Sequence, residues 1–166
     1  MPTDTVWGIG CDATNIAAVN KVYEIKKRAE SKSLIILVDS LAMLSKYIPY
    51  IPKKVEVLLK ESRTPTTIIY TNPIGFPENM VAKDNTIAIR IPEDEFCKNL
   101  IRKFGKPIVS TSANISGNPT PKSFTEIESA ILQSVDYIVN LHREKVSEKS
   151  STILKIDGDK IRVLRE

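Results

Sequence analysis

The sequence Lys106-Pro-Ile-Val-Ser-Thr-Ser-Ala-Asn-Ile-Ser-Gly117 joins a short apolar segment to a cluster of hydroxyl and amide side chains. Residues 106–109 predict a buried strand, and the prolines after the cluster cannot continue regular structure. Residues 110–118 carry four hydroxyls and two amides, and ligands bind beyond the strand ends in open α/β sheets. With Gly117 allowing close approach, the cluster suits an oxyanion such as phosphate or carboxylate. The alternative, slightly preferred on the local sequence alone, is a set of turns whose hydroxyls bond only their own backbone.

The chain has 166 residues, so we expect a single domain with its own core over residues 1–166. Its 42% hydrophobic and 27% charged residues are typical of a globular protein. No apolar run reaches the roughly 20 residues that span a bilayer, and there is no signal peptide, so we expect no membrane contact. Cys11 and Cys97 form no CxxC motif, which argues against a zinc site or disulfide framework and favours a reduced, cytoplasmic setting.

The net charge of +4 and the pI near 9.0 favour anionic partners without identifying one. A solvated basic surface without a partner explains the same charge. His142 is the only histidine, which argues against a histidine triad, a zinc hydrolase or a histidine general base, and we expect it in an exposed loop. The sequence has no GxxxxGK[ST] motif, so any nucleotide is bound without a P-loop.

The first thirteen residues place small polar groups ahead of Trp7 and glycines at Gly8 and Gly10. We expect a loop in which the backbone and side chains make a close approach to another group, which the sequence does not identify. The alternative is a plain turn that buries Trp7.

Residues 14–28 repeat apolar positions at helical spacing, and Asp12 or Thr14 can cap the helix that they predict. The end of this helix is basic, with the four cations Lys26, Lys27, Arg28 and Lys32. Such cations either interact with the helix dipole or hold a triphosphate. The residues alone leave both interpretations open.

Strands mixed with helices and followed by a hairpin imply a mixed-sheet α/β domain. In strand 86–92, Ile87, Ile89 and Ile91 share one face, so Arg90 points to the other, where it is either a clamp for carboxylate or phosphate or a simple surface ion pair. The other predicted elements are strand 34–38, a short helix from Ser40, helix 52–61, strand 66–71, a loop over 72–83, helix 93–104, helix 123–133 opened by a Ser123/Glu126 capping box, strand 135–141, and a hairpin of 152–157 with 160–164.

Five motifs in this order resemble those of the YrdC/Sua5 family, the threonylcarbamoyl-AMP synthases. They are Pro2-Thr-Asp-Thr-Val-Trp-Gly-Ile-Gly10, which looks like the family's P-T-[DE]-T-V-[YF]-G-L-G; Lys26-Lys-Arg28, its K-x-R; Ile87-Ala-Ile-Arg-Ile-Pro92, its V-x-x-R-x-P; Ser110-Thr-Ser-Ala-Asn-Ile-Ser-Gly117, its S-T-S-A-N-x-S-G; and Ser150-Ser-Thr-Ile153, its P-S-T-I. Together they cover nearly the whole chain.

The sequence departs from the family at several points. The usual N-terminal helix and strand before the first motif are missing, and W-P-G-P-x-T is reduced to Ser62-Arg-Thr-Pro-Thr-Thr67. Ala29 and Ser150 replace prolines, and Leu37 stands where some members have a histidine.

The resemblance implies a single YrdC-like domain of the α/β (α+β) class, with a twisted sheet of parallel and antiparallel strands, flanking helices and a concave basic face. It also implies an enzyme that makes threonylcarbamoyl-AMP and pyrophosphate from ATP, bicarbonate and L-threonine, for the t6A37 modification of tRNA. Threonine's amine becomes a carbamate that attacks the α-phosphate. No protein nucleophile is needed, so the site must position anionic partners and neutralise charge.

The motif match also implies a role for particular residues. Catalytic roles would fall to Lys26, Arg28, Ser112 and Asn114. ATP would be bound by Arg28, Lys32, Thr86, Ser112, Asn114 and either Arg162 or Arg165. L-Threonine would be bound by Thr3, Lys26, Arg90, Ser110 and Ser151, with Arg90 taking the carboxylate. Mg²⁺ carried with ATP would bridge phosphates, without a dedicated carboxylate cluster on the protein, and no prosthetic group is expected.

Three other readings stay open at this stage. The chain could be an inactive or truncated family-like module that grips a nucleotide, tRNA or double-stranded RNA. It could be a carbamoyl-transfer domain of the hydrogenase-maturation type, although the zinc-binding and acylphosphatase-like parts of those proteins are absent here. It could belong to the YciO-like branch, against which the intact S-T-S-A-N and K-x-R argue. Proteins of the t6A pathway are expected as partners of the enzyme.

Overall fold

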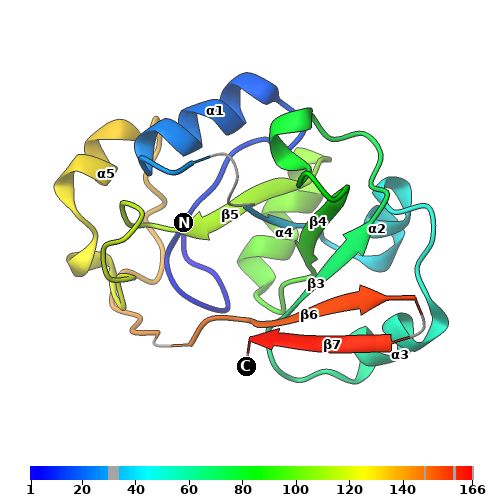
Figure 1. The fold of residues 1–166 in the computed structure, drawn as a ribbon. Coiled ribbons are helices and arrows are strands. Elements are labelled where there is room, and N and C mark those ends of the chain that lie inside the picture. The colour runs from blue at the N-terminus through cyan, green and yellow to red at the C-terminus, as the bar shows by residue number, and fades with distance from the viewer. Residues whose placement is uncertain (30–33, 148, 159, 166) are drawn as a thin grey trace.

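The computed structural model describes residues 1–29, 34–147, 149–158 and 160–165. Within them a seven-stranded sheet has the order β1-β5-β2-β4-β3-β6-β7 (Figure 1). Pairing is parallel at β2–β4 and β3–β6 and antiparallel elsewhere, so the predicted mixed sheet is confirmed. The strands are β1 Gly8–Ile9, β2 Ile35–Leu37, β3 Thr66–Thr71, β4 Thr86–Arg90, β5 Ile108–Ser112, β6 Thr152–Asp157 and β7 Lys160–Arg165.

Helices flank this sheet. In Figure 1, α4 lies behind the strands, and α5 lies at the opposite end of the molecule from α2 and α3. In the part of the chain that is described, no helix has the length and apolar character needed to cross a membrane. The helices are α1 Ile16–Ile25, α2 Leu41–Tyr47, α3 Lys53–Glu61, α4 Glu95–Phe104 and α5 Ser129–Ser134, with short 3-10 helices at Glu78–Met80 (η1) and Phe124–Glu126 (η2).

The strand register divides the sheet into an apolar and a polar face. Residues directly opposite each other in paired strands point to the same face. Ile36 lies opposite both Ile89 and Val109, and Ile68 lies opposite both Ile89 and Leu154. All five are buried in the core. The predicted apolar face of β4 is therefore confirmed, and the alternate residues of these strands form the polar face.

Helix α1 begins later than the predicted caps allow, by one residue for Thr14 and by three for Asp12. Its N-cap is Asn15, whose Oδ1 accepts hydrogen bonds from the amides of Ala17 and Ala18 at 3.0 and 3.1 Å. The predicted caps Asp12 and Thr14 bond each other instead, because Asp12 Oδ1 accepts from the Thr14 amide at 2.8 Å. An aspartate used in its own turn cannot cap the helix that follows.

Helix α1 also ends at Ile25 and not near Arg28. Lys27 has a φ of 48°, in the left-handed region. The Arg28 amide donates to the Tyr23 carbonyl at 2.9 Å, and the Lys27 amide donates to the Glu24 carbonyl at 3.0 Å. This pair of bonds is a Schellman motif. The basic residues therefore lie in a tight turn that leaves the helix, and not on its last turn.

Three further predictions near residue 130 are wrong. The predicted helix 123–133 divides into η2 and α5, because Ile127 between them is extended, with a φ of −69° and a ψ of 125°. The capping box is not formed: Glu126 Oε2 accepts from the Lys122 amide at 2.9 Å. Residues 135–141 form no strand. The apolar side chains of Val135, Ile138 and Val139, which suggested a strand, line an apolar groove instead.

Candidate active site

Four of the predicted site residues, Thr86, Arg90, Ser110 and Ser112, share the polar face of the sheet. Leu37 lies opposite both Arg90 and Ile108, and alternation along β4 and β5 places Thr86, Ser110 and Ser112 on the same face. Strand β5 extends through Ser112, so Ser110 and Ser112 are strand residues and not, as predicted, part of the loop. From the strand spacing and rise, the backbones of Arg90 and Ser112 lie roughly 16 Å apart, a span that suits an extended ligand with charge along its length.

Arg90 is buried with one N–H group unpaired. Its side chain is 4% exposed, its Nη1 donates to Thr5 Oγ1 at 3.1 Å, and its Nη2 lies 3.3 Å from Asp4 Oδ1. Among the described residues its Nε has no partner. Burial lowers the pKa of Arg90, and the Asp4 carboxylate opposes this shift. A buried unpaired donor on a guanidinium is costly, which fits a missing anionic ligand. The alternative of a surface ion pair is wrong.

A chain of hydroxyls supports Arg90. Thr3 Oγ1 donates to the Val6 carbonyl at 2.8 Å and accepts from the Thr5 amide at 3.1 Å. Because its only proton is used, the 3.0 Å contact between Thr3 Oγ1 and Thr5 Oγ1 has Thr5 as the donor. Thr3 is then saturated, whereas Thr5 keeps one lone pair. Thr3 therefore orders the loop, and Thr5 is the threonine of this motif that can still meet a ligand.

Ser151 reaches the same region from the other end of the chain. Its Oγ lies 2.7 Å from Thr67 Oγ1, and both side chains are buried. The Ser151 carbonyl accepts from Arg165 Nε at 3.1 Å and from Arg165 Nη2 at 2.7 Å. Thr67 lies opposite Arg90 in the β3–β4 pair. We call Thr3, Asp4, Thr5, Thr67, Arg90, Ser151 and Arg165 the Arg90 cluster.

Ser110 lies between this cluster and the loop after β5. Its partner on β2 is Ile35, which in turn lies opposite Ala88, two residues before Arg90. Strand β1 passes close to it: a Cβ at Gly8 would lie 3.1 Å from Ser110 Oγ and 3.2 Å from the Thr111 carbonyl oxygen. The close approach predicted for the N-terminal glycines is confirmed at Gly8. Trp7 is also buried, so the close approach of the segment and the burial of Trp7, which were predicted as alternatives, occur together.

Lys26 is the C-cap of α1 and is 1% exposed. Its Nζ donates to the carbonyls of Ser112 and Asn114, the latter at 2.7 Å, and its own carbonyl accepts from the Ser116 amide at 2.8 Å. Burial, and then the positive charge of Arg28, lower the pKa of Lys26 to about 8. The structure therefore places this predicted catalytic residue against the backbone of the hydroxyl loop.

The loop after β5 keeps two buried polar atoms unpaired. Asn114 Nδ2 donates to the carbonyls of Ile115 and Asn118 at 3.1 and 2.8 Å, as the turn interpretation predicts. Yet in the described part of the chain, Asn114 Oδ1 and Ser116 Oγ have no partner, as the ligand interpretation predicts. Gly117 has a positive φ of 95° and open space around it, so the close approach of an oxyanion at this glycine stays a prediction.

A polar cavity opens beside Asn114. Its volume is about 270 Å³, and it is lined by Ala113, Asn114, Asn118, Pro119, Thr120, Pro121, Glu126 and Glu128. Arg28, half-buried, stands at the Schellman turn, and burial lowers its pKa. Lys26, Arg28 and Asn114 therefore belong to one region, which we call the loop site.

Two predicted nucleotide ligands, Thr86 and Arg162, are not brought into the loop site. Thr86 Oγ1 donates to Asp84 Oδ1 at 2.6 Å. Arg162 is exposed on β7 and lies 3.2 Å from Asp157 Oδ2. Lys32 lies outside the described residues. Arg165, the alternative to Arg162, belongs to the Arg90 cluster instead.

The site residues that sequence reasoning missed are Asp4, Thr5 and Thr67. Asp4 and Thr5 stand inside the first motif, so the motif itself was the available signal. Thr67 closes the segment that replaces W-P-G-P-x-T, and its pairing with Ser151 depends on the β3–β6 register. No group of three or more His, Cys, Asp or Glu that could hold a metal ion occurs among the described residues.

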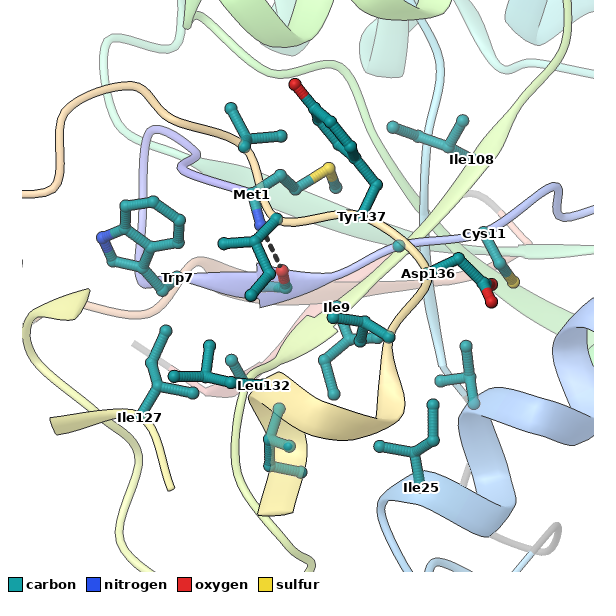
Figure 2. A pocket seen from close by; sticks show the side chains of 18 of the residues that line it. Met1, Trp7, Ile9, Cys11, Ile25, Ile108, Ile127, Leu132, Asp136 and Tyr137 are labelled. Atoms are coloured by element: carbon teal, nitrogen blue, oxygen red, sulfur yellow. Dashed lines mark hydrogen bonds between the residues drawn. The ribbon is translucent and has the colours of Figure 1, made fainter. Parts of the chain in front are cut away.

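An apolar groove of about 520 Å³ lies outside the polar face, beside β1 (Figure 2). Ile9, Ile25 and Leu132 point into it from β1, α1 and α5. At its centre the Met1 amine donates to the Gly8 carbonyl at 2.8 Å, and burial lowers the pKa of this amine to about 6. Most of its lining is apolar, and the charged Lys21 and Asp136 in that lining are paired with each other at 2.8 Å, so the groove is not the candidate active site.

The comparisons with known proteins agree with this geometry. The model of the Sua5/YciO/YrdC family, described as telomere recombination, matches residues 1–166. A Methanocaldococcus jannaschii protein provisionally named threonylcarbamoyl-AMP synthase is 40% identical over 164 residues, 99% of this chain and 76% of that protein. The threonylcarbamoyl-AMP synthase of Pseudoalteromonas translucida is 36% identical over 145 residues, 84% of this chain and 76% of that protein.

Solved structures share the fold. P. abyssi Sua5 complexed with L-threonine has a TM-score of 0.87 and 29% identity, covering 99% of this chain and 48% of that one. This chain thus spans about half of the Sua5 structure. E. coli YciO has a TM-score of 0.85 at 24% identity, covering 99% of this chain and 80% of that one, a likeness in fold.

Proposed function

The chain belongs to the Sua5/YciO/YrdC family, and on that premise we propose that it is an L-threonylcarbamoyladenylate synthase. It would make threonylcarbamoyl-AMP and pyrophosphate from L-threonine, bicarbonate and ATP for the t6A37 modification of tRNA, and so would be a nucleotidyltransferase. The observation that carries the proposal is the unpaired Nε of buried Arg90, on the same sheet face as Ser110 and Ser112. Relatives that share 36% identity with this chain are named for this activity.

The reaction suits a site without a nucleophile. The amine of threonine condenses with bicarbonate, releasing water, and leaves a carbamate. A carbamate oxygen then forms a bond to the α-phosphorus, and the bond from that phosphorus to the oxygen bridging to the β-phosphate breaks, releasing pyrophosphate. The protein's part is to hold anions in line and offset their charge.

The Arg90 cluster would bind L-threonine. The unpaired Arg90 Nε takes a carboxylate oxygen, and the free lone pair of Thr5 accepts from the substrate hydroxyl or amine. Ser151 and Ser110 supply further hydroxyls. Thr3 acts through Thr5 because its own hydroxyl is saturated.

The loop site would bind ATP. Asn114, Ser112 and Ser116 offer polar groups beside the 270 Å³ cavity, and the Arg28 guanidinium supplies charge for the phosphates. Lys32 is proposed as a second cation by motif match alone. Contact of ATP with Thr86 and Arg162 stays a prediction. In the structure Thr86 is hydrogen-bonded to Asp84 and Arg162 is paired with Asp157.

Mg²⁺ stays a proposal as an ion carried by the nucleotide. The described residues hold no group of three or more His, Cys, Asp or Glu that could bind it, so the phosphates would supply most of its ligands. Other proposals remain. A concave basic face and contact with tRNA or double-stranded RNA are supported by the net charge of +4. Partnership with proteins of the t6A pathway rests on the family resemblance alone, and a cytoplasmic setting rests on Cys11 and Cys97, which form no CxxC motif.

The test is pyrophosphate release from ATP and bicarbonate, with and without L-threonine, followed by identification of threonylcarbamoyl-AMP. The proposal expects release that depends on threonine and bicarbonate together. Serine in place of threonine gives a matched substrate control. Binding of ATP and threonine without release would favour the alternative of an inactive binding module, and RNA affinity that falls steeply with salt would then support it.

A further inference from the structure

Lys26 holds the loop after β5 at three backbone positions. Its Nζ donates to the carbonyls of Ser112 and Asn114, and its carbonyl accepts from the amide of Ser116. The three bonds fall on alternate residues of the segment 112–116. A single residue of α1 thus bridges the helix end and the whole segment.

The segment needs such a support because the sheet no longer provides one. Strand β5 ends at Ser112, so Asn114 and Ser116 lie outside the β-ladder, and Asn114 is buried. Buried carbonyls require donors. The Schellman turn at Lys27 ends the helix directly after Lys26, and the Lys26 side chain supplies donors to these carbonyls.

The ammonium has little left for a ligand. It has three N–H donors, two of which are bonded to protein carbonyls, and the side chain is 1% exposed. Burial and the neighbouring Arg28 lower the pKa of Lys26 to about 8. A neutral amine still has two N–H donors, which match the two carbonyls.

We propose that Lys26 is a positioning residue that fixes residues 112–116 before any ligand binds, and that it is not a ligand of the phosphates. Contact with phosphate charge is left to Arg28. The consequence for nucleotide binding rests on the proposed function, whereas the effect on the loop does not.

The experiment compares Lys26→Met, Lys26→Gln and the exposed control Lys60→Met. Amide hydrogen exchange is first measured on the ligand-free proteins, and ATP affinity is then measured by calorimetry. In Lys26→Met, exchange at residues 114–118 is expected to accelerate about tenfold or more, because a charge-assisted bond is lost, while β4 amides are unchanged. ATP affinity falls by a similar factor.

Lys26→Gln separates positioning from direct contact with the phosphates. Glutamine retains N–H donors but no charge, so it is expected to recover part of the loop protection and of the ATP affinity. A direct phosphate ligand would lose the same affinity in both variants and leave ligand-free exchange unchanged, which would overturn the proposal. If Lys26→Met does not fold, the Lys26→Gln comparison still decides. If no variant or wild type binds ATP, the proposed function fails while the exchange data still test the loop.

Discussion

The hydroxyl oxygens of Thr67 and Ser151 lie 2.7 Å apart, although the two residues are 84 positions apart in the sequence. Each hydroxyl has one proton and the contact uses one of the two. The β3–β6 pairing therefore determines how Ser151 presents its hydroxyl beside Arg90. Thr67 contributes to the site without being a predicted ligand.

Thr67→Val is expected to raise the KM for L-threonine by about fivefold to tenfold, because a buried hydrogen bond contributes roughly 1 kcal/mol, and to change the KM for ATP little. Thr67→Ser keeps the hydroxyl and should behave like the wild type. Steady-state pyrophosphate release gives both constants. Equal effects of the two variants would show that packing, and not the hydroxyl, matters at this position.

Arg90→Lys keeps the charge but loses the planar fork that reaches Asp4 and Thr5 through separate nitrogens. We expect threonine affinity to fall at least about tenfold, with ATP affinity unchanged. The control is Arg102→Lys, an exposed arginine on α4. Calorimetric titration with each substrate tests this, and equal losses for ATP and threonine would contradict the assignment of Arg90 to threonine.

The pH dependence of stability should reveal Lys26. Its pKa of about 8 in the folded protein lies below the ordinary lysine value of 10.5. Between these two pH values the unfolded chain binds more protons than the folded one, so the free energy of unfolding rises with pH. Below pH 8 both states are protonated and the contribution is constant.

Denaturant unfolding of wild type and Lys26→Met from pH 7 to pH 10 measures this effect. The stability difference should move in favour of wild type by up to about 3 kcal/mol above pH 8. A difference that is independent of pH, or that moves the other way, would mean that Lys26 is not desolvated as the structure shows.

Gly8→Ala should disturb both stability and threonine binding. The added Cβ would lie 3.1 Å from Ser110 Oγ, so we expect about 1–2 kcal/mol of destabilisation and a raised KM for threonine. Gly117→Ala is the control, because it strains a φ of 95° in open space and should cost about 1 kcal/mol without changing that KM. Melting curves and kinetics of both variants provide the measurement.

Alternation along a strand is a local property, which is why the sequence predicted that Arg90 faces away from Ile87 and Ile89. The motif likewise grouped Ser110, Ser112 and Asn114 in one segment, and the structure places them at the end of β5 and in the loop that follows it. The hydrogen bonds that decide which side chains can still bind a ligand are made within the folded N-terminal loop or join residues that are distant in the sequence. Thr3 is saturated by Thr5 and Val6, and Lys26 is bonded to carbonyls 86 and 88 positions away.

The failed predictions have the same physical origin. Residues 135–141 were predicted to form a strand because Val135, Ile138 and Val139 are apolar. In the structure these side chains line the apolar groove without pairing with another strand. Asp12 has a side chain suited to a helix cap, but it does not cap α1 because its Oδ1 is used in the Asx turn with Thr14. Apolar pattern and cap chemistry limit the choices, and tertiary contacts select among them.

The Arg90 cluster joins residues 3–5 to Ser151 and Arg165, from opposite ends of the sequence. During synthesis on the ribosome, the segment with Thr5 and Arg90 emerges long before β7. A nascent chain thus lacks the hydrogen bonds from Arg165 to the Ser151 carbonyl until β7 has been synthesised. A ligand that contacted Thr5 and Ser151 together, as the proposed threonine would, would link residues 3–5 to residues 151–165 and resist the opening of either segment.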